Sequence, residues 1–409
     1  MAPRTVASSP RPAFARWISQ SNSITQQFMA MGIQPDFISM AGGLPAAEFY
    51  PAAAIAEASE KAMARWGSMA LEYGPIEGFP ALRQQIAERI SREAGRTFTI
   101  ENVLLTTGAM QGLDLLGKVL IDPGDRVVAQ FPTYVGALDA WRPRLPVYEP
   151  LDWSAPGGTG VDALRLAKFI YTVPNYSNPT GALVSTAARK ALLEKAMQAG
   201  TWLVEDDPYL PLQFDGATGP SILALHGRME RDGPYEGPVV YLGTLSKSIV
   251  PGLRVGWTIA SRDMIQALTL AKQSSDISSS MLTQAIALEL LESGFEAHHV
   301  PSIVRHYRQR RDALCAAANA ELGEWFEWEM PPGGMFVWMR GRHSAIDTDV
   351  LYGFALDAKV AFVPGSVFDP AAKLRSAMRV NFTRSAPTVL EEGVSRLAVA
   401  VKRYMASNH

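Results

Sequence analysis

Residues 244–254 read Thr-Leu-Ser-Lys-Ser-Ile-Val-Pro-Gly-Leu-Arg and follow closely on an apolar run. At the end of a buried strand, loss of water and a nearby cation would lower the pKa of the Lys247 amine and free it to attack a carbonyl. Thr244, Ser246 and Arg254 could hold a phosphate, the arginine through paired charge-assisted bonds. Pyridoxal 5'-phosphate (PLP) would offer both an aldehyde and a phosphate to such a site. The alternative is a surface loop with an ordinary lysine.

The chain around this stretch alternates strand-like and helix-like segments. The strand-like runs are Val103–Thr107, Arg126–Phe131, Phe169–Val173, Trp202–Glu205, Val239–Leu242 and Val255–Ala260. Helix-like segments such as Gly112–Leu120 and Thr186–Ala199 lie between most of them. This order predicts an α/β fold with a largely parallel sheet covered by helices on both faces.

The pattern changes after residue 285. A long helix is predicted through Arg305–Asp312, and short strands are predicted around Met335–Met339, Ala361–Val363 and Met378–Phe382. These elements predict a smaller α+β domain, and a length of 409 residues suits two domains. The arginine-rich run could be read as a nucleic-acid patch. With a net charge of -2 on the whole chain, we expect a solvated helix face instead and no nucleic-acid partner.

The composition argues against several further classes of protein. No apolar run approaches the roughly 18 residues that a membrane helix requires, so no membrane association is expected. The single cysteine, Cys315, excludes an intramolecular disulfide and fits a reducing compartment. Residues 1–35 contain arginines but no acidic residue, as in a transit peptide, yet their prolines would break an amphipathic helix. We therefore expect a flexible arm on a cytoplasmic protein.

Polar residues follow several of the predicted strands, where parallel sheets bind ligands. The turn Thr107–Gly112 opens a helix whose free amides would suit a phosphate. Asn178 could donate to a phenolate oxygen, although its Asn-Pro sequence also fits a plain turn. Asp206, at a buried strand end, needs a cationic partner, and a protonated pyridine nitrogen would be one. The clustered His298, His299 and His306 lack companions at ligand spacing, so no metal site is predicted.

In this order and spacing, the clusters resemble the fold type I PLP-dependent aminotransferases of class I/II. Within them the chain is similar to the 2-aminoadipate and kynurenine aminotransferases. The resemblance runs from Ile38-Ser39-Met40-Ala41-Gly42-Gly43-Leu44-Pro45 to Arg379-Val380-Asn381-Phe382, nearly the whole chain. It implies three parts: an N-terminal arm and helix at 1–45, which contribute to the small domain and a dimer interface, a large PLP-binding domain at 46–290, and a small C-terminal domain at 291–409.

The resemblance also implies a role for each candidate residue. Lys247 resembles the lysine that binds the PLP aldehyde as a Schiff base and later moves the substrate's α-proton. Asp206 matches the carboxylate that pairs with the pyridine nitrogen. Tyr209 and Asn178 match groups that hydrogen-bond to the cofactor's 3'-oxygen. Tyr134 looks like the aromatic ring that stacks on the pyridine.

Phosphate and substrate contacts are implied in the same way. The expected phosphate ligands are the backbone amides of Ala109 and Met110 and the side chains of Thr244, Ser246 and Arg254. Tyr73 matches a tyrosine that reaches the phosphate of the neighbouring subunit, which implies a homodimer with shared active sites. Arg379 resembles the arginine that binds the substrate α-carboxylate, with Asn178 and Gly43 nearby; on a strand, it could also be a structural ion pair.

Two positions depart from the subgroup. Many relatives have Ser at the position of Ala109, so one hydroxyl contact to the phosphate is missing. In the 2-aminoadipate enzymes an N-terminal segment carries an arginine that neutralises the substrate side chain, and Thr25 is the matching residue here. An acidic side chain would then lose its charge partner. With Thr25 at this substrate-contacting position, neutral or aromatic amino donors are favoured, and 2-aminoadipate is possible if another arginine takes the place of the missing one.

The resemblance implies a ping-pong aminotransferase that moves the amino group of an L-amino acid to a 2-oxo acid such as 2-oxoglutarate or pyruvate. A PLP-dependent lyase or decarboxylase of the same fold would share every residue named. A transcription regulator with an aminotransferase-like domain needs a winged-helix domain, for which the roughly 40 residues before Ala41 leave no room. An NAD-linked oxidoreductase is disfavoured because no G-x-G-x-x-G follows a strand.

Overall fold

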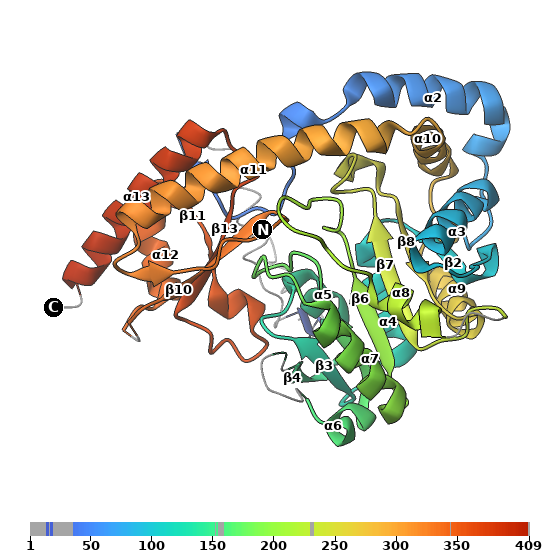
Figure 1. Ribbon diagram of the computed structural model, residues 1–409, viewed down its shortest axis with the longest axis horizontal. Coiled ribbons are helices and arrows are strands. Elements are labelled where there is room, and N and C mark those ends of the chain that lie inside the picture. The colour runs from blue at the N-terminus through green and yellow to red at the C-terminus, as the bar shows by residue number, and fades with distance from the viewer. Residues whose placement is uncertain are drawn as a thin grey trace, which may run out of the picture.

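The computed structural model describes residues 14–15, 17–18, 36–151, 153, 159–229, 233–343 and 345–407. Two sheets organise this part of the chain, and helices pack around both (Figure 1). The larger sheet has the strand order β2-β8-β7-β6-β5-β3-β4. Its strands are β2 (Val103–Thr106), β3 (Arg126–Gln130), β4 (Val147–Leu151), β5 (Ala167–Thr172), β6 (Trp202–Asp206), β7 (Val239–Thr244) and β8 (Gly256–Ile259).

The larger sheet is largely parallel, as predicted. Strands β3 to β7 pair in parallel, whereas β8 runs antiparallel to both β2 and β7. The central strands consist mainly of apolar residues because helices cover both faces. Every predicted strand of this region is present, but β4 was not predicted. It is an edge strand whose residues are mostly half-exposed, so its sequence lacks the apolar run of a buried strand.

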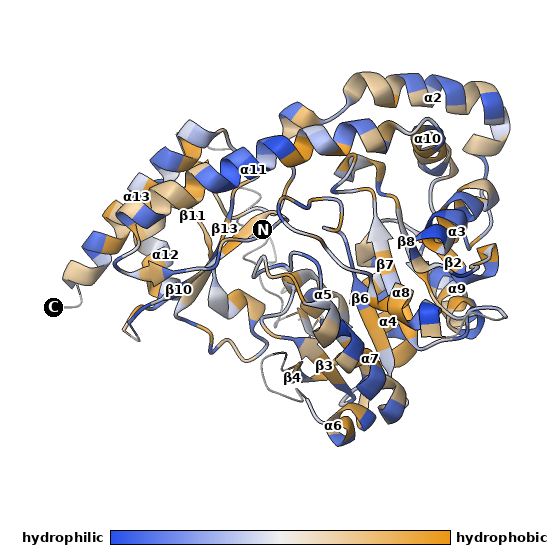
Figure 2. Cartoon of the chain, in the orientation of Figure 1, coloured by the Kyte–Doolittle hydropathy of each residue, from blue (hydrophilic) through white to orange (hydrophobic). Residues whose placement is uncertain are grey.

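Helices form a layer on each face of the large sheet, as predicted. Helices α4 (Ala109–Leu120), α5 (Val135–Trp141) and α9 (Arg262–Asp276) share one apolar core with one set of strand residues. On the opposite face, the alternate strand residues pack against α3 (Pro80–Ala94), α6 (Val161–Arg165), α7 (Thr186–Ala199), α8 (Ile222–Met229) and α10 (Met281–Glu292). Figure 2 shows the apolar colouring of the central strands between these layers.

A smaller antiparallel sheet has the strand order β12-β13-β10-β9. Its strands are β9 (Phe326–Glu327), β10 (Phe336–Gly341), β12 (Val363–Pro364) and β13 (Ala377–Asn381). The accompanying helices are α11 (Phe295–Glu321), α12 (Thr348–Asp357) and α13 (Pro387–Ser407). The N-terminal strand β1 (Ile38–Ser39) pairs in parallel with β11 (Val360–Ala361), so the start of the described chain joins these C-terminal elements. The smaller α+β unit expected from the sequence is present, and the three-part division of the chain stays a prediction.

One further helix and several short 3-10 turns complete the fold. They are helix α2 (Ala52–Trp66) and the 3-10 turns η2 (Ala47–Phe49), η3 (Gly67–Leu71), η4 (Ile100–Asn102), η5 (Arg142–Arg144), η6 (Pro251–Leu253) and η7 (Gly365–Phe368). No helix in the described ranges is long and apolar enough to cross a membrane.

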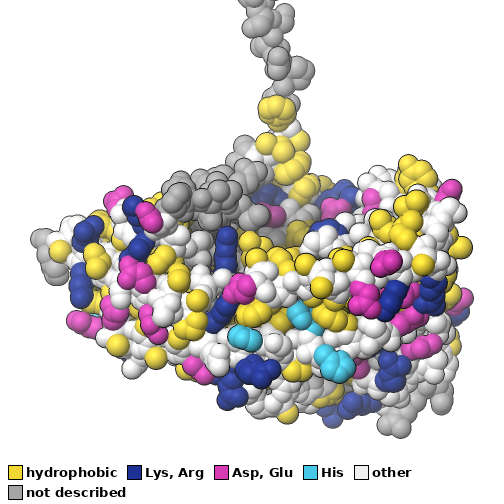
Figure 3. Space-filling view, turned by 90° about the horizontal axis from the view of Figure 1, so that it is seen from above, with side chains coloured by type: hydrophobic (Ala, Val, Ile, Leu, Met, Phe, Trp, Pro, Cys, Tyr) yellow, Lys and Arg dark blue, Asp and Glu magenta, His cyan; other side chains and the backbone are white. Residues whose placement is uncertain are grey.

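The arginine-rich run on α11 is the predicted solvated helix face only in part, because Arg305 and Arg308 are exposed but two other arginines are buried. Arg310 is buried, pairs with Glu48 and donates to the Thr383 carbonyl. Arg311 is also buried and pairs with Asp215. The run therefore joins α11 to neighbouring segments, because a buried guanidinium needs partners. Seen from above, the face that includes α2 and α11 carries basic and acidic side chains interspersed (Figure 3).

Candidate active site

Nearly all the predicted cofactor and substrate residues meet in one cavity of about 480 Å³. The cavity lies at the carboxyl ends of the central parallel strands, where β6 ends in Asp206 and β7 ends in Thr244. Ligands bind at this edge of parallel sheets because strand ends and helix N-termini converge there. The predicted residues that line it are Gly43, Ala109, Met110, Tyr134, Asn178, Asp206, Tyr209, Thr244, Ser246, Lys247, Arg254 and Arg379.

Lys247 lies in the turn that follows β7. Its Nζ donates to the carbonyl of Gly43 at 2.9 Å. Burial, followed by the positive charges of Arg379 and Arg254, lowers the pKa of Lys247 to about 8. A lysine held in this way exposes more neutral amine near neutral pH than a surface lysine does, which is what a nucleophilic amine requires.

Asp206 is buried at the end of β6, and only one of its carboxylate oxygens has a partner. The Tyr171 hydroxyl, on β5, donates to Asp206 Oδ2 at 2.8 Å. Asp206 Oδ1 is buried and finds no hydrogen-bond partner in the described part of the chain. Burial raises the pKa of Asp206 to about 7, the Tyr171 hydrogen bond opposes that rise, and Asp207 adds to it. A cationic N–H donor placed at Oδ1 would satisfy this carboxylate.

The phosphate site predicted at the start of α4 has an open backbone. Gly108 is the N-cap of α4 and makes no side-chain cap, so the first amides of the helix are available to an anion. Gly108 has a φ of 75°, and a Cβ built there would lie 2.6 Å from Arg254 Nη2. A Cβ on Gly256 would lie 2.8 Å from the amide nitrogen of Ala109. Gly108 therefore lets Arg254 approach the helix N-terminus, and Gly256 lets strand β8 lie against the backbone of that N-terminus.

The hydroxyls of the second predicted phosphate segment lie close to each other. Thr244 Oγ1 donates to Ser246 Oγ at 2.9 Å and accepts from the backbone N–H of Ser246 at 3.1 Å. The turn after β7 therefore brings both hydroxyls to the same edge of the cavity as Arg254.

Arg379 is buried on β13, inside the cavity, and its geometry does not support a structural ion pair. It donates to Asn178 Oδ1 and to the carbonyl of Ala41, both at 2.6 Å. No carboxylate of the described chain lies within ion-pair distance of this guanidinium, and its Nε has no hydrogen-bond partner there. Burial lowers the pKa of Arg379 to about 10. A buried guanidinium without a counter-charge calls for an anionic ligand.

Aromatic rings surround this arginine. The Arg379 guanidinium carbon lies 4.3 Å from the ring centre of Phe336 and 4.9 Å from that of Phe368. Phe336 is a buried core residue, and its ring face also orients the guanidinium of Arg379. Asn178 Nδ2 also donates to the Tyr209 hydroxyl, at 3.4 Å, which links Arg379 to the predicted 3'-oxygen donor.

Two predicted positions lie outside this cavity. The side chain of Tyr73 is 83% exposed in the single chain, so it does not contact its own cavity. Its predicted reach into a neighbouring subunit stays a prediction. Thr25 lies outside the described residues.

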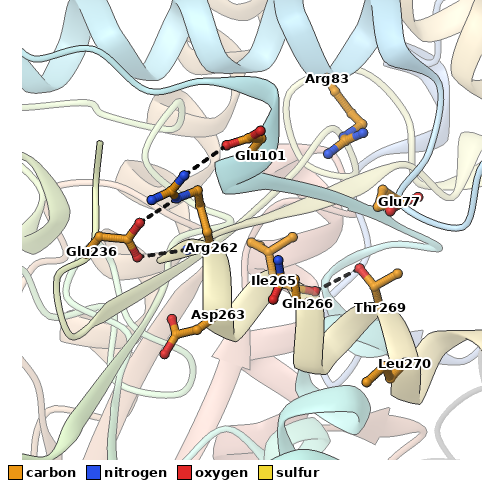
Figure 4. A pocket seen from close by; sticks show the side chains of 10 residues that line it. All are labelled: Glu77, Arg83, Glu101, Glu236, Arg262, Asp263, Ile265, Gln266, Thr269 and Leu270. Atoms are coloured by element: carbon orange, nitrogen blue, oxygen red, sulfur yellow. Dashed lines mark hydrogen bonds and ion pairs between the residues drawn. The ribbon is translucent and has the colours of Figure 1, made fainter. Parts of the chain in front are cut away.

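A larger pocket, of about 820 Å³, lies elsewhere, beside α9. Arg262 pairs with two of its carboxylates: Arg262 Nε donates to Glu236 at 2.6 Å, and Arg262 Nη1 reaches Glu101 at 3.5 Å (Figure 4). Arg83, on its wall, donates to the backbone carbonyls of Val103 and Ile100. None of the described residues that line this pocket is a lysine, so it fits the predicted chemistry less well than the Lys247 cavity.

The residues present fit PLP. Asp206 Oδ1 offers an unmet acceptor for a pyridine N–H, Lys247 offers an amine with a lowered pKa, and Gly108 leaves space beside Arg254 for a phosphate. These are the three features of the cofactor that a protein must hold: ring nitrogen, aldehyde and phosphate.

Comparison with known proteins decides the family. Residues 38–397 match the family described as Aminotransferase class I and II. The chain belongs to this family. It is similar to Aromatic-amino-acid aminotransferase 1 of Thermococcus litoralis, with 37% identity over 384 residues that cover 90% of this chain and 89% of the relative. The protein is a PLP-dependent aminotransferase, so the fold, cofactor and enzyme class predicted from the sequence are confirmed.

Solved structures agree with this assignment. The aminotransferase resembles the alpha-aminoadipate aminotransferase of Thermus thermophilus, complexed with N-(5'-phosphopyridoxyl)-L-leucine, at a TM-score of 0.85 and 35% identity; the match covers 96% of this chain and 98% of that one. It also resembles the Pyrococcus horikoshii kynurenine aminotransferase in complex with PMP, at a TM-score of 0.86 and 32% identity, covering 96% and 97% of the two chains.

Sequence reasoning missed three polar residues at this site: Tyr171, Asp139 and Arg384. Tyr171 lies within a predicted strand, where its hydroxyl gives no signal until β5 and β6 are paired. Arg384 lines the cavity but follows β13 by only a few residues and matches no motif used above. The one available signal for Arg384 was its position five residues after Arg379.

Proposed function

We propose that this aminotransferase takes the amino group of a neutral or aromatic L-amino acid and passes it to a 2-oxo acid such as 2-oxoglutarate or pyruvate by a ping-pong mechanism. The observation that carries the proposal is the buried Arg379, which faces the cavity of Lys247 with no carboxylate partner among the described residues. The α-carboxylate common to amino acids and 2-oxo acids would supply that partner.

The residues divide the work of the reaction by position. Arg379 would bind the α-carboxylate and, being held by Asn178 and the Ala41 carbonyl, would fix the orientation of the substrate. PLP, when bound, supplies an aldehyde and an electron-withdrawing ring. Lys247 would accept the proton from the substrate α-carbon and deliver it to the carbon supplied by the cofactor's aldehyde, acting as general base and then general acid. Asp206, ionised, would hold a proton on the ring nitrogen.

The hydrogen-bonded residues Asn178 and Tyr209 would also hold the cofactor. Burial holds the pKa of Tyr209 well above its usual range, so its hydroxyl remains a hydrogen-bond donor at neutral pH. It would donate to the cofactor's 3'-oxygen together with Asn178. Tyr134, a residue with its pKa raised to about 12 by burial, would lie against the ring.

The lining of the cavity supports a neutral or aromatic donor. Apolar side chains occupy much of its wall: Leu44, Leu113, Val135, Val363, Val367 and Phe368. Such a wall gains free energy by covering an apolar substrate side chain. The similar proteins include aromatic-amino-acid, alpha-aminoadipate and kynurenine aminotransferases, which is compatible with this range of donors.

The decisive experiment mixes the PLP-loaded enzyme with single amino acids and no acceptor. A stoichiometric yield of 2-oxo acid, one per active site, is expected from a transaminase, and the ranking of rates identifies the donor. Continuous product formation without an acceptor would indicate lyase or decarboxylase chemistry and overturn the proposal. The Lys247→Ala variant should lose turnover by several orders of magnitude; steady-state transamination by this variant would contradict the role given to Lys247.

We also propose a homodimer in the cytoplasm with active sites shared between subunits. Its support is an exposed apolar region beside Tyr73, which includes Met63, Met69 and Leu71. Mixing Lys247→Ala subunits with Tyr73→Phe subunits tests sharing. If Tyr73 serves the partner's site, each hybrid dimer contains one fully wild-type site and activity rises above that of either variant. If Tyr73 serves its own site, mixing yields no gain. The support for the cytoplasm is the single, buried Cys315.

A further inference from the structure

Arg384 lines the same cavity as Lys247 and Arg379 but has no role in the chemistry described so far. It lies just beyond the end of β13, the strand that carries Arg379. Its side chain is half-buried. A cation in this position, near the α-carboxylate site but separate from it, can select among substrates by their side chains.

The backbone at Arg384 is held firmly. Asn381 Oδ1 accepts from the backbone N–H groups of Thr383, at 3.0 Å, and Arg384, at 3.2 Å. Thr383 Oγ1 donates to the carbonyl of Leu44 at 3.0 Å. The turn after β13 is thereby attached to residues 41–44, which also contact the substrate arginine and the lysine. The backbone of Arg384 is therefore fixed in position relative to residues 41–44.

Three cationic side chains approach consecutive residues of the segment 41–44. Arg379 donates to the carbonyl of Ala41, Lys247 donates to that of Gly43, and a Cβ built on Gly42 would lie 4.0 Å from Arg384 Nη1. Neighbouring Cα atoms are about 3.8 Å apart. Arg379 and Arg384 approach neighbouring residues of this segment, so their points of approach are separated by about one residue. One short molecule can contact both.

The charges of the cavity point to the kind of molecule. Among the described residues, its cationic lining consists of Lys247, Arg254, Arg379 and Arg384, and its carboxylates are Asp139 and Asp206. Asp139 pairs with Arg142 at 2.5 Å. In the proposed function, the cofactor phosphate would face Arg254, the ring nitrogen would face Asp206, and the α-carboxylate would face Arg379. A second carboxylate on the substrate would match Arg384, the cation of this lining to which the proposed function gives no part of the cofactor or substrate.

We propose that Arg384 binds the distal carboxylate of a dicarboxylic substrate, and so determines the use of 2-oxoglutarate as acceptor and of acidic amino acids as donors. This inference rests on the proposed function, since it takes Arg379 as the α-carboxylate site. Arg384 would supply the positive charge for the substrate side chain that an arginine supplies in the 2-aminoadipate enzymes and that Thr25, at the matching position here, cannot. Neutral and aromatic side chains would use the apolar wall, so one cavity would serve both halves of the ping-pong cycle.

The test compares binding of glutarate, an unreactive five-carbon dicarboxylate, with binding of pentanoate by the PLP-loaded enzyme, using titration calorimetry. Glutarate should bind at least about 10-fold more tightly than pentanoate, the difference expected for one added charge-assisted contact. In Arg384→Gln the advantage of glutarate should shrink to less than about 3-fold, and in Arg384→Lys part of it should return. An advantage that persists undiminished in Arg384→Gln would overturn the proposal.

A second pair of variants leaves Arg384 itself in place. Gly42→Asp would set a carboxylate beside Arg384 and should remove the glutarate advantage, whereas Gly42→Ala adds only a methyl in ordinary contact at 3.9 to 4.0 Å and should keep it. Arg340→Gln, an exposed arginine on β10 outside the cavity, is the charge-loss control and should change nothing. Equal loss in Gly42→Asp and Gly42→Ala would contradict the charge argument.

Kinetics separates this inference from the proposed function. The ratio of kcat/KM for 2-oxoglutarate to that for pyruvate should fall about 10- to 100-fold in Arg384→Gln. A change in this ratio of less than 3-fold would overturn the role of Arg384 while leaving transamination intact. If the wild-type enzyme transaminates no amino acid at all, the proposed function fails instead, and the glutarate comparison can still be read because it requires no turnover.

Discussion

Removing the Tyr171 hydroxyl tests how the protein keeps Asp206 ionised. In Tyr171→Phe the ring keeps its edge contact with Trp141, whose centroid lies 5.1 Å away, so packing is preserved. What is lost is the 2.8 Å hydrogen bond to Asp206 Oδ2. Because that bond favours the charged carboxylate, the pKa of Asp206, already raised to about 7, should rise further in the cofactor-free protein.

The size of the effect follows from the bond that is removed. A hydrogen bond contributes about 1.5 to 3 kcal/mol when it is made to a charged group and about 0.5 to 1.5 kcal/mol when it is made to a neutral one. One pKa unit corresponds to about 1.36 kcal/mol of the difference between the two, so the pKa of Asp206 should rise by about one unit. The folded-state pKa lies above the unfolded value, so the free energy of unfolding decreases as pH rises toward the folded-state pKa. In the variant this decrease should continue to a higher pH than in the wild type.

Urea unfolding of the cofactor-free protein at pH 5 and pH 9 measures this. At pH 5 Asp206 is protonated in both proteins, and the variant should lose only the roughly 0.5 to 1.5 kcal/mol of a neutral hydrogen bond. At pH 9 the loss should reach about 1.5 to 3 kcal/mol. Burial keeps the pKa of Tyr171 well above its usual range, so the hydroxyl stays protonated throughout. The same pair of measurements in an Asp206→Asn background should show no pH dependence of the Tyr171→Phe cost.

An equal cost at both pH values would refute this reasoning, because it would mean that Tyr171 stabilises the fold without regard to the charge on Asp206. A pH-dependent cost that survives in the Asp206→Asn background would refute it too, since another carboxylate would then be responsible.

Three further predictions rest on single features. Asp206→Asn should raise the melting temperature of the cofactor-free protein at pH 8 but much less at pH 4, because the buried charge is present only above its raised pKa; equal shifts would contradict this. Gly108→Ala should weaken PLP binding at least about 10-fold, because the added Cβ would displace Arg254, the proposed phosphate ligand. Gly124→Ala is the control: Gly124 has a φ of 91° and no atom within 4 Å of an added Cβ, so PLP binding should not change. Fluorescence titration measures both. Arg311→Met should lower the free energy of unfolding, measured in urea, by about 1 to 3 kcal/mol. Arg308→Met, at an exposed position, should lower it by less than about 0.5 kcal/mol. Similar values for the two variants would contradict the contribution given to the buried position of Arg311.

The sequence allowed the prediction of elements whose apolar residues are continuous. The central strands of the large sheet have nearly their predicted bounds, because burial on both faces requires apolar runs. The edge strand β4 was missed for the opposite reason: only its last residue is buried, so it contains no such run. Short elements at the margin of a sheet depend on the pairing of distant segments, which local pattern does not reveal.

The candidate site shows the same limit. Lys247, Asp206 and Arg379 could be placed because each follows or occupies a recognisable strand. The hydrogen bond from Tyr171 to Asp206 joins residues 35 positions apart, and the contact of Arg310 with Glu48 joins residues 262 positions apart. Partners at such separations become visible only when the fold brings them together, so the exposure and role of a charged side chain could not be read from its neighbours in the chain.

The segment 41–44 has a consequence for how this enzyme can vary. Ala41, Gly43 and Leu44 accept hydrogen bonds from Arg379, Lys247 and Thr383 through their backbone carbonyls. Every residue type carries a backbone carbonyl, so the acceptor groups do not depend on the side chains of this segment, although a Cβ on Gly43 would lie 3.0 Å from the ring of Phe336. Inserting or deleting one residue would move all three carbonyls out of register together. The length of this loop is thus constrained by three contacts at once, and libraries that alter loop length here should contain few active members.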